Sequence, residues 1–489
     1  MEAISEELGN LYRNNTMTFV SKLPKGVKPI NTGWIFTVKR NEKNIIYRFK
    51  ARIVARGNYQ IKGINFLLTY VPTLNLDSIK FIIAYACKQN WKIFQLDIKS
   101  AYLNADLEEK IYVNIPEGDK NYKKGYWLLN KALYGLKQSG RAWFITIKNF
   151  IIKCGFDQLK SEPCIFRKYD NNNNITCLIG IYVDDMIITC KSHDIENIIN
   201  VIKQKFKISN CGEAKYLLGI IIERNFNSYL IHQRNFIENL LNTFKISNLK
   251  NAKTPCTGDN IISENNTPFD STIYKSALGS LIYLSRATRP DIAFAVNKAS
   301  RKCENPTYSD WRKIINVLKY LNSTKNFKIK YDGQGDFVAY TDADFGGDTK
   351  DRKSTSGNII LMGKNPIMWQ SKKQTIVATS TAESEYISTS ECTKRVLWLR
   401  NMLEELINFN KPITIFTDNM ASKRSIENGE LNTKLKHISI KFYFNYDNIK
   451  NNKIKLEYKD TNNMLADILT KDVNGTKMKK FTDLIFVKN

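Results

Sequence analysis

The stretch Cys177-Leu-Ile-Gly-Ile-Tyr-Val-Asp-Asp-Met-Ile-Ile-Thr-Cys190 places two adjacent carboxylates, Asp184 and Asp185, inside a run of apolar residues. Apolar residues on both sides predict two short strands that join at the aspartates. Two like charges beside buried strands are costly unless something neutralises them. A divalent cation does so, and carboxylate oxygens favour magnesium. The alternative is an ordinary hairpin turn, in which aspartate is common.

A third carboxylate favours the metal-binding interpretation. Asp97 ends another strand-like apolar segment, Trp91-Lys-Ile-Phe-Gln-Leu-Asp97, directly before a predicted helix start. Three carboxylates at strand ends can hold two metal ions, one that activates an attacking hydroxyl and one that stabilises the leaving oxygen. Asp97, Asp184 and Asp185 therefore predict phosphoryl transfer, which depends on positioning and charge neutralisation.

The composition points to a nucleic-acid partner. The chain has 489 residues and a formal net charge of +27, which predicts two or three domains and a polyanionic partner. Frequent Lys, Asn and Ile also suit an AT-rich coding sequence, which accounts for part of the basicity. The nine cysteines form no C-x-x-C pair and only three histidines are present, which argues against structural zinc and favours free thiols in a reducing compartment.

No targeting or membrane segment is visible. The first residues, Met1–Glu7, are acidic and lack an apolar core, and no apolar run is long enough to span a bilayer. We therefore expect a soluble intracellular protein with no membrane partner.

Apolar periodicity predicts the order of the elements along the chain. Residues 33–57 alternate as a basic hairpin with a turn at 41–44, and residues 216–222 form one strand that pairs with 229–232. Residues 250–272, rich in Thr, Asn, Asp and Pro, predict a linker. From about residue 337 to 471, strands and helices alternate.

This C-terminal part contains a second set of acidic residues. They follow the order strand, helix, strand, helix and are Asp342, Glu385, Asp418 and Asp467. In an α/β unit, such carboxylates can converge on one cleft and form a second two-metal site, where water attacks a phosphodiester. Each one alone could be a solvated charge or a residue at a helix N-terminus. Glu383 is the alternative to Glu385 as the ligand.

Nine motifs follow one another along the chain, among them Gln95-Leu-Asp-Ile-Lys-Ser-Ala-Tyr-Leu-Asn104 and Tyr182-Val-Asp-Asp185. The others lie at 47–57, 132–139, 288–293, 341–346, 352–357, 380–386 and 466–471. In this order, they resemble the reverse transcriptase and RNase H portion of a copia-type LTR retrotransposon Pol polyprotein, from about residue 3 to residue 475.

The resemblance implies a multidomain α+β and α/β fold: a right-hand polymerase with fingers, palm and thumb, then a connection and an RNase H-like α/β domain. The implied boundaries are 1–255 for the polymerase, 256–335 for the linker and connection, 336–475 for the RNase H-like domain and 476–489 for a C-terminal tail.

The resemblance also implies roles for individual residues. Asp97, Asp184 and Asp185 would hold two Mg²⁺ in the palm, and Asp342, Glu385, Asp418 and Asp467 would hold two more for RNase H cleavage. The implied nucleotide-binding residues are Lys50, Arg52, Tyr102, Tyr134 and Gly135, with Tyr102 excluding a ribose 2′-hydroxyl. The implied primer-binding residues are Leu218 and Gly219. His437 matches a family motif without a role that we can derive, and a structural histidine is the alternative.

The expected function is magnesium-dependent primer extension on RNA and DNA templates with cleavage of RNA in RNA–DNA hybrids. The expected partners are an RNA template, a DNA primer, the hybrid and deoxynucleoside triphosphates, with the capsid and integrase products of the same element. The expected location is the cytoplasm, in a virus-like particle if the element is complete, with nuclear entry. The alternatives are a decayed or domesticated nucleic-acid-binding fragment and a cellular repair polymerase.

Overall fold

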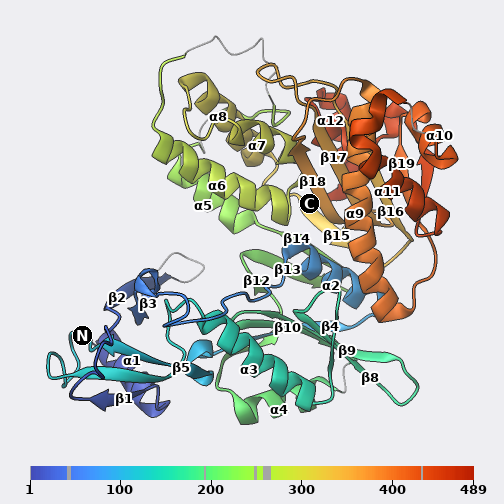
Figure 1. Ribbon diagram of the computed structural model, residues 1–489. Helices are drawn as coiled ribbons and strands as arrows, with labels where there is room; N and C mark the ends of the chain where they lie inside the picture. The colour runs from blue at the N-terminus through green and yellow to red at the C-terminus, as the bar shows by residue number, and fades with distance from the viewer. Residues whose placement is uncertain are drawn as a thin grey trace. The chain divides into compact units, whose positions relative to one another are not determined.

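The computed structural model describes residues 2–40, 46–191, 194–246, 250–256, 266–430 and 433–488 (Figure 1). The predicted turn at 41–44 and part of the predicted linker at 250–272 lie outside the described residues. The chain forms two units that are discontinuous in sequence. Unit 1 comprises Met1–Leu74 and Phe94–Gly212, and unit 2 comprises Asn75–Ile93 and Glu213–Asn489.

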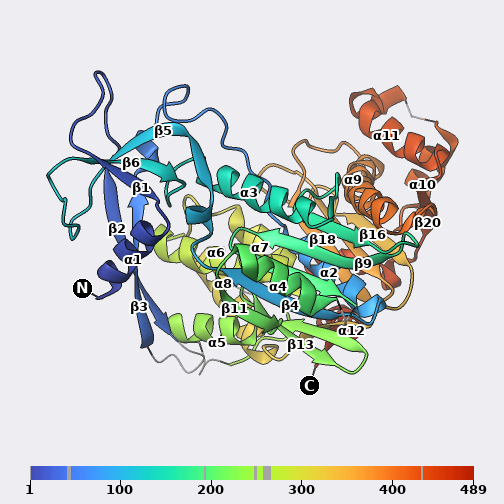
Figure 2. The ribbon, with the colours of Figure 1, turned by 90° about the horizontal axis from the view of Figure 1, so that it is seen from below.

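The predicted pair of strands around Asp184 and Asp185 forms the middle of a six-stranded sheet. Its order is β11 (Ile208–Glu213), β4 (Lys92–Ile98), β10 (Asp185–Cys190), β9 (Ile175–Tyr182), β8 (Ile165–Tyr169) and β7 (Asp157–Gln158). Figure 2 shows α3 (Ser139–Lys153) and α4 (Ile195–Lys205) beside this sheet. Their apolar residues share one buried core with its strands. This packing holds the strand ends that carry the aspartates.

Two smaller sheets complete unit 1. The predicted basic hairpin is present as β2 (Thr32–Arg40) and β3 (Ile46–Ala55), paired antiparallel. A three-stranded sheet has the order β1 (Met17–Val20), β6 (Tyr126–Lys131) and β5 (Asp106–Asn114). The amphipathic helix α1 (Glu2–Arg13) places Leu8 and Leu11 in a core with Ile53 of β3 and Trp127 of β6.

Unit 2 contains a five-stranded sheet and a group of four helices. The sheet order is β12 (Tyr216–Leu217), β13 (Ile220–Asn225), β14 (Ser228–His232), β15 (Lys328–Tyr331) and β21 (Phe486–Val487). Four helices of unit 2 share a separate core: α5 (Arg234–Thr243), α6 (Ser271–Ala287), α7 (Ala293–Ser300) and α8 (Tyr308–Ser323).

The prediction of one strand over 216–222 is wrong. The chain reverses there, and β12 pairs antiparallel with β13. Leu218 and Gly219 form the turn, with φ angles of 48° and 78°. Continuous apolar character hides this turn from periodicity, because leucine seldom adopts a positive φ.

The predicted C-terminal α/β part, from about residue 337 to 471, forms another five-stranded sheet in unit 2. Its order is β18 (Asn365–Lys373), β17 (Thr355–Met362), β16 (Phe337–Ala343), β19 (Ile413–Thr417) and β20 (Ile454–Tyr458), with β16, β19 and β20 mutually parallel. Its helices are α9 (Thr381–Ile407), α10 (Met420–Asn428) and α11 (Ser439–Lys450). The end of the chain, assigned above to a tail, forms α12 (Gly475–Ile485) and β21.

None of the described helices is long and apolar enough to cross a membrane.

The motif at 288–293 forms a buried ion pair in unit 2. The Arg289 guanidinium contacts the Asp291 carboxylate at 2.7 Å, and both side chains are almost fully buried. Arg289 also donates to the Thr324 carbonyl at 3.1 Å, and the Tyr320 hydroxyl donates to Asp291 at 2.8 Å. The hydrogen bonds satisfy both charges, so removing one partner leaves the other uncompensated.

We expect Asp291→Ala to lower the free energy of unfolding by about 3–5 kcal/mol, because it leaves the Arg289 charge buried without its partner. Urea unfolding followed by tryptophan fluorescence measures this. Asp336→Ala, which removes an exposed aspartate of the same unit, should change stability by no more than about 0.5 kcal/mol. Equal effects of the two substitutions would contradict a stabilising role for the buried pair.

Two candidate carboxylate sites

A tight turn places the first carboxylates. Tyr182 and Asp185 face each other across the β9–β10 pair, so Val183 and Asp184 form a two-residue turn. Val183 has a φ of 52°, which is strained for a β-branched residue. The Trp143 indole, fully buried on α3, donates to the Val183 carbonyl at 2.7 Å and holds this turn.

The neighbouring strand β4 brings Asp97 to the same end of the sheet. The Ile98 amide donates to the Asp184 carbonyl at 2.9 Å. Gln95, two residues before Asp97, donates to Asp185 Oδ1 at 3.1 Å. Asp97 on β4, Asp184 in the β9–β10 turn and Asp185 at the start of β10, which we call the first set, therefore lie at one end of two adjacent strands.

Burial makes the first set electrostatically costly without a cation. Burial raises the pKa of Asp184 to about 6; the nearby Arg52 lowers this pKa, whereas Asp97 and Asp185 raise it further. Burial also raises the pKa of Asp185, against the hydrogen bond from Gln95. Asp184 Oδ1 is buried and has no hydrogen-bond partner among the described residues. An unsatisfied anionic oxygen of this kind fits a divalent-metal ligand.

The predicted nucleotide-binding residues gather beside the first set. The Arg52 guanidinium lies 4.8 Å from the ring centroid of Tyr134. The Tyr102 and Tyr134 rings lie 4.8 Å apart. Lys50 lies close enough to lower the pKa of Asp184 electrostatically. Two tyrosines and two cations therefore adjoin the carboxylates.

The backbone at residue 135 lies so close to the backbone of β3 that only glycine fits there. Its φ is 87°, and a Cβ there would lie 2.1 Å from the Ala55 carbonyl oxygen of β3. The adjacent Tyr134 carbonyl accepts a hydrogen bond of 2.8 Å from the Ala55 amide. Any side chain at 135 would push β3, and with it Arg52, away from Tyr134.

The predicted primer-binding residues belong to unit 2. Leu218 and Gly219 form the β12–β13 turn, and the Tyr283 hydroxyl of α6 donates to the Leu218 carbonyl. A Cβ at Gly219 would lie 2.9 Å from that hydroxyl oxygen.

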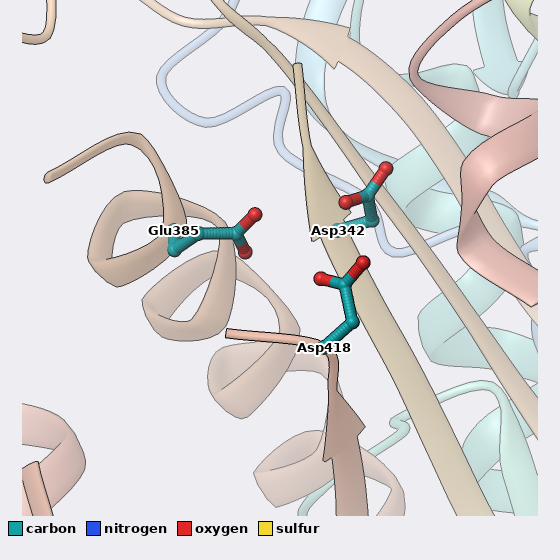
Figure 3. Close-up of side chains that lie close together, drawn as sticks. All are labelled: Asp342, Glu385 and Asp418. Atoms are coloured by element: carbon teal, nitrogen blue, oxygen red, sulfur yellow. The ribbon is translucent and has the colours of Figure 1, made fainter. Parts of the chain in front are cut away.

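The second carboxylate cluster comprises Asp342 on β16, Glu385 on α9 and Asp418 directly after β19 (Figure 3). One ligand oxygen from each lies within 4.8 Å of the others, and within the described ranges these residues are the group of three metal-ligating side chains that meets this distance. The first set does not approach as closely. Adjacent parallel strands and a helix packed on them bring the three together.

Glu385, and not the alternative Glu383, belongs to this cluster. Glu383 accepts hydrogen bonds from the Thr379 amide and hydroxyl, each at 2.7 Å, and contacts His437 Nε2 at 2.6 Å. Glu383 therefore ties the start of α9 to the segment that carries His437.

Asp467 is the member of the predicted set that the structure does not bring into the cluster of three. It lies in the 3₁₀ helix Leu465–Leu469, buried, and forms ion pairs with Lys471 at 3.0 Å and with Lys477. Its charge still acts on Asp342 and raises the pKa of that residue.

The second cluster is also costly to ionise. Burial raises the pKa of Asp342 to about 7, while the nearby Lys471 lowers it. Burial, followed by the charges of Asp342 and Asp418, raises the pKa of Glu385 well above its usual value. Glu385 Oε2 is buried and has no hydrogen-bond partner in the described part of the chain. These donors also fit a divalent cation.

Sequence reasoning missed the groups that support Asp342. The Thr470 hydroxyl donates to Asp342 Oδ2, and Lys471 Nζ lies 3.6 Å from the same oxygen. Gly357 of β17 allows this approach, because a Cβ there would lie 2.6 Å from Thr470 Cγ2. Gly357 belongs to the motif at 352–357, and Thr470 and Lys471 belong to the motif at 466–471, but the spacing of these motifs assigned no role to the three residues.

The chain is similar to known reverse transcriptases. A family model described as "Reverse transcriptase (RNA-dependent DNA polymerase)" matches residues 14–258, half of the chain. The chain belongs to this reverse transcriptase family.

Curated relatives extend the similarity beyond the matched family region. A retrovirus-related Pol polyprotein from transposon TNT 1-94 of Nicotiana tabacum is 34% identical over 99% of this chain and 37% of its own length. The retrovirus-related Pol polyprotein from transposon RE1 of Arabidopsis thaliana is 32% identical over 99% of this chain and 33% of its own length. This chain thus spans about a third of the length of these relatives. The resemblance to copia-type Pol polyproteins is confirmed.

A solved structure supports the fold. The foamy viral protease–reverse transcriptase, determined with double-stranded DNA, covers 94% of this chain and 69% of its own, with a TM-score of 0.51 at 12% identity. The reverse transcriptase chain therefore has a fold of the retroviral polymerase kind.

We expect the Mg²⁺-dependent rise in melting temperature to grow from pH 6 to pH 8. Protonation stabilises the metal-free folded state while pH lies below the raised pKa of Asp342, about 7, and that stabilisation is lost as pH rises through it. A cation replaces the proton above this pH. Differential scanning fluorimetry in Mg²⁺ and in EDTA measures the difference.

Asp342→Asn should reduce the metal-dependent rise at pH 8, whereas the exposed control Asp336→Asn should retain it. A rise that is equal at both pH values, or unchanged in Asp342→Asn, would contradict metal binding by the second cluster.

Proposed function

We propose that this chain is an RNA-directed DNA polymerase with a fused RNase H. The observation that carries the proposal is Asp184 in the β9–β10 turn, whose buried Oδ1 has no hydrogen-bond partner among the described residues, inside a region that matches the reverse transcriptase family. The division 1–255, 256–335 and 336–475 would then correspond to polymerase, connection and RNase H, with 476–489 as the end of the last part.

In the polymerase, the first set would hold two Mg²⁺. Bound there, the ions would lower the pKa of the primer 3′-hydroxyl and offset charge on the leaving pyrophosphate oxygen. Arg52, with Lys50, would hold the incoming triphosphate by charge-assisted hydrogen bonds. Leu218 and Gly219 would hold the primer end through the backbone of their turn.

Tyr102 would select deoxynucleotides. Its ring packs against Tyr134, beside Asp184, whose charge acts on both phenols. A ring fixed in this position leaves little room for a ribose 2′-hydroxyl. Gly135 would let the peptide backbone approach the same sugar.

In the RNase H part, Asp342, Glu385 and Asp418 would hold the metal ion that activates water. Together with Asp467, they would provide the ligands for two metal ions. The support is the cluster within 4.8 Å and the unpartnered Glu385 Oε2. Lys471 would reduce the cost of ionising Asp342, because its charge opposes the effect of burial on the pKa of that residue.

The substrates would be an RNA template, a DNA primer, deoxynucleoside triphosphates and the RNA–DNA hybrid. The foamy viral neighbour was solved with double-stranded DNA, and the net charge of +27 suits a duplex backbone. We propose that the chain works with capsid and integrase products in cytoplasmic particles. A decayed fragment would bind nucleic acid without catalysis, although all seven predicted carboxylates are present here.

Substituting one carboxylate in each site should separate the two activities. Asp185→Asn should reduce extension of oligo(dT) on poly(rA) with dTTP by about a thousandfold, since a metal ligand supplies several kcal/mol of transition-state stabilisation. It should leave hybrid cleavage intact. Asp342→Asn should do the opposite, and the exposed control Asp106→Asn should retain both activities. A wild-type protein that binds hybrid but performs neither reaction would favour the decayed fragment.

Tyr102→Val should lower the discrimination between dUTP and UTP, measured as the ratio of kcat/KM values, by about 10- to 200-fold, because it opens space at the sugar. The control Tyr102→Phe keeps the ring and should keep the discrimination. If the Val variant still rejects UTP as the wild type does, Tyr102 is only a packed aromatic.

A further inference from the structure

A large cavity lies in unit 2 outside both carboxylate sites. It has a volume of about 640 Å³ and is bounded by α7, the start of α8 and the loop that joins β16 to β17. The cationic side chains that line it are Lys298, Arg301, Lys302, Lys313, Lys350 and Lys373. With three aspartates in the lining, the cavity has an excess of three positive charges.

Two of these aspartates hold cationic side chains of the cavity in place, and the lining keeps its net positive charge. Asp348 contacts Arg301 at 2.9 Å and Lys373 at 2.6 Å, and Asp351 contacts Lys373 at 2.8 Å. Burial alone would raise the pKa of Asp348, but hydrogen bonds from Lys373, the Lys350 amide and Arg301 hold it well below its usual value. Arg301 and Lys373 are thus fixed in direction before any ligand arrives.

Lys302 and Lys350 are the exposed cations of the cavity. Lys302 follows α7, and Lys350 lies in the β16–β17 loop, so they approach the cavity from two separate elements. The hydroxyls of Thr307 and Ser309, 2.9 Å apart, also line it. Fixed cations, exposed lysines and hydroxyls together suit a phosphate group.

The cavity is joined directly to the strand that carries Asp342. Asp348 is six residues beyond Asp342, so the two Cα atoms lie no more than about 20 Å apart. Arg301 donates to the Thr355 hydroxyl at 3.0 Å, and the Thr355 amide donates to Asp344. A nucleic-acid strand has one phosphate per roughly 3.4 Å, so about six phosphates at most separate the two places.

We propose that this cavity binds a backbone phosphate of the RNA–DNA hybrid, within about six nucleotides of the bond that is cleaved at Asp342, Glu385 and Asp418. The proposal rests on the proposed RNase H function. The phosphate would be held by Lys302 and Lys350 against the fixed Arg301 and Lys373, and would set the register of the hybrid relative to the carboxylates.

The test compares two double variants of the full chain. Lys302→Ala/Lys350→Ala removes two exposed cations of the cavity, and Lys364→Ala/Lys411→Ala removes two exposed lysines of unit 2 that do not line it. Circular dichroism and the melting temperature check folding. Hybrid binding is measured by fluorescence anisotropy in EDTA over a range of salt concentrations, so binding is separated from cleavage.

The cavity variant should bind the hybrid about tenfold more weakly at 0.1 M salt, and the slope of log K against log salt should fall by about one to two, relative to the control variant. In Mg²⁺, its KM for hybrid cleavage should rise by more than its kcat falls. Equal binding by both double variants would overturn the proposal. Absence of cleavage by the wild type would instead contradict the proposed function.

Hybrids with one neutral methylphosphonate at successive positions locate the phosphate and distinguish it from a free phosphate ligand. One or two positions within about six nucleotides of the cut should weaken binding by the wild type and have no effect on the cavity variant. If every position weakens both proteins alike, the cavity does not hold a backbone phosphate.

Discussion

Desolvation of clustered carboxylates is the constraint on which both sites depend. Folding places Asp184 and Asp342 in environments that raise their pKa values to about 6 and about 7. An unpartnered buried oxygen, on Asp184 in one site and on Glu385 in the other, marks where the protein leaves its own charge unsatisfied. Such a cost persists only when rigid elements impose it, and a bound cation would offset it.

Two groups of buried charges in unit 2, outside the carboxylate sites, are compensated by ion pairs within the protein. Arg289 and Asp291 satisfy each other with help from Tyr320. In α2 (Leu76–Lys88), Lys80 pairs with Asp77 at 2.9 Å and lies over the ring of Trp369, while Arg395 of α9 contacts Asp77 at 3.0 Å. The carboxylates of Asp77 and Asp291 thus have cationic partners, whereas Asp184 Oδ1 and Glu385 Oε2 have no hydrogen-bond partner among the described residues.

Backbone geometry does as much as side-chain identity to form the sites. Val183 accepts a strained φ so that Asp184 projects from a two-residue turn, and Trp143 holds that turn. Gly135 and Gly357 allow the chain to approach β3 and Thr470 more closely than any side chain would permit. These features appear in sequence only as a valine or as isolated glycines, so periodicity does not detect them. The β12–β13 reversal at Leu218 escaped prediction for the same reason.

The sequence by itself determined the strands that have Asp97, Asp184, Asp342 and Asp418 at or next to their ends, because alternating or continuous apolar residues require burial. Its motifs also determined the family. Only the tertiary structure decided which carboxylates lie together, and it placed Glu385 beside Asp342 and Asp418. Glu383 instead contacts His437, and Asp467 forms ion pairs with Lys471 and Lys477. The physical reason is that helix direction and strand order bring together residues far apart in sequence, and local apolar periodicity contains neither.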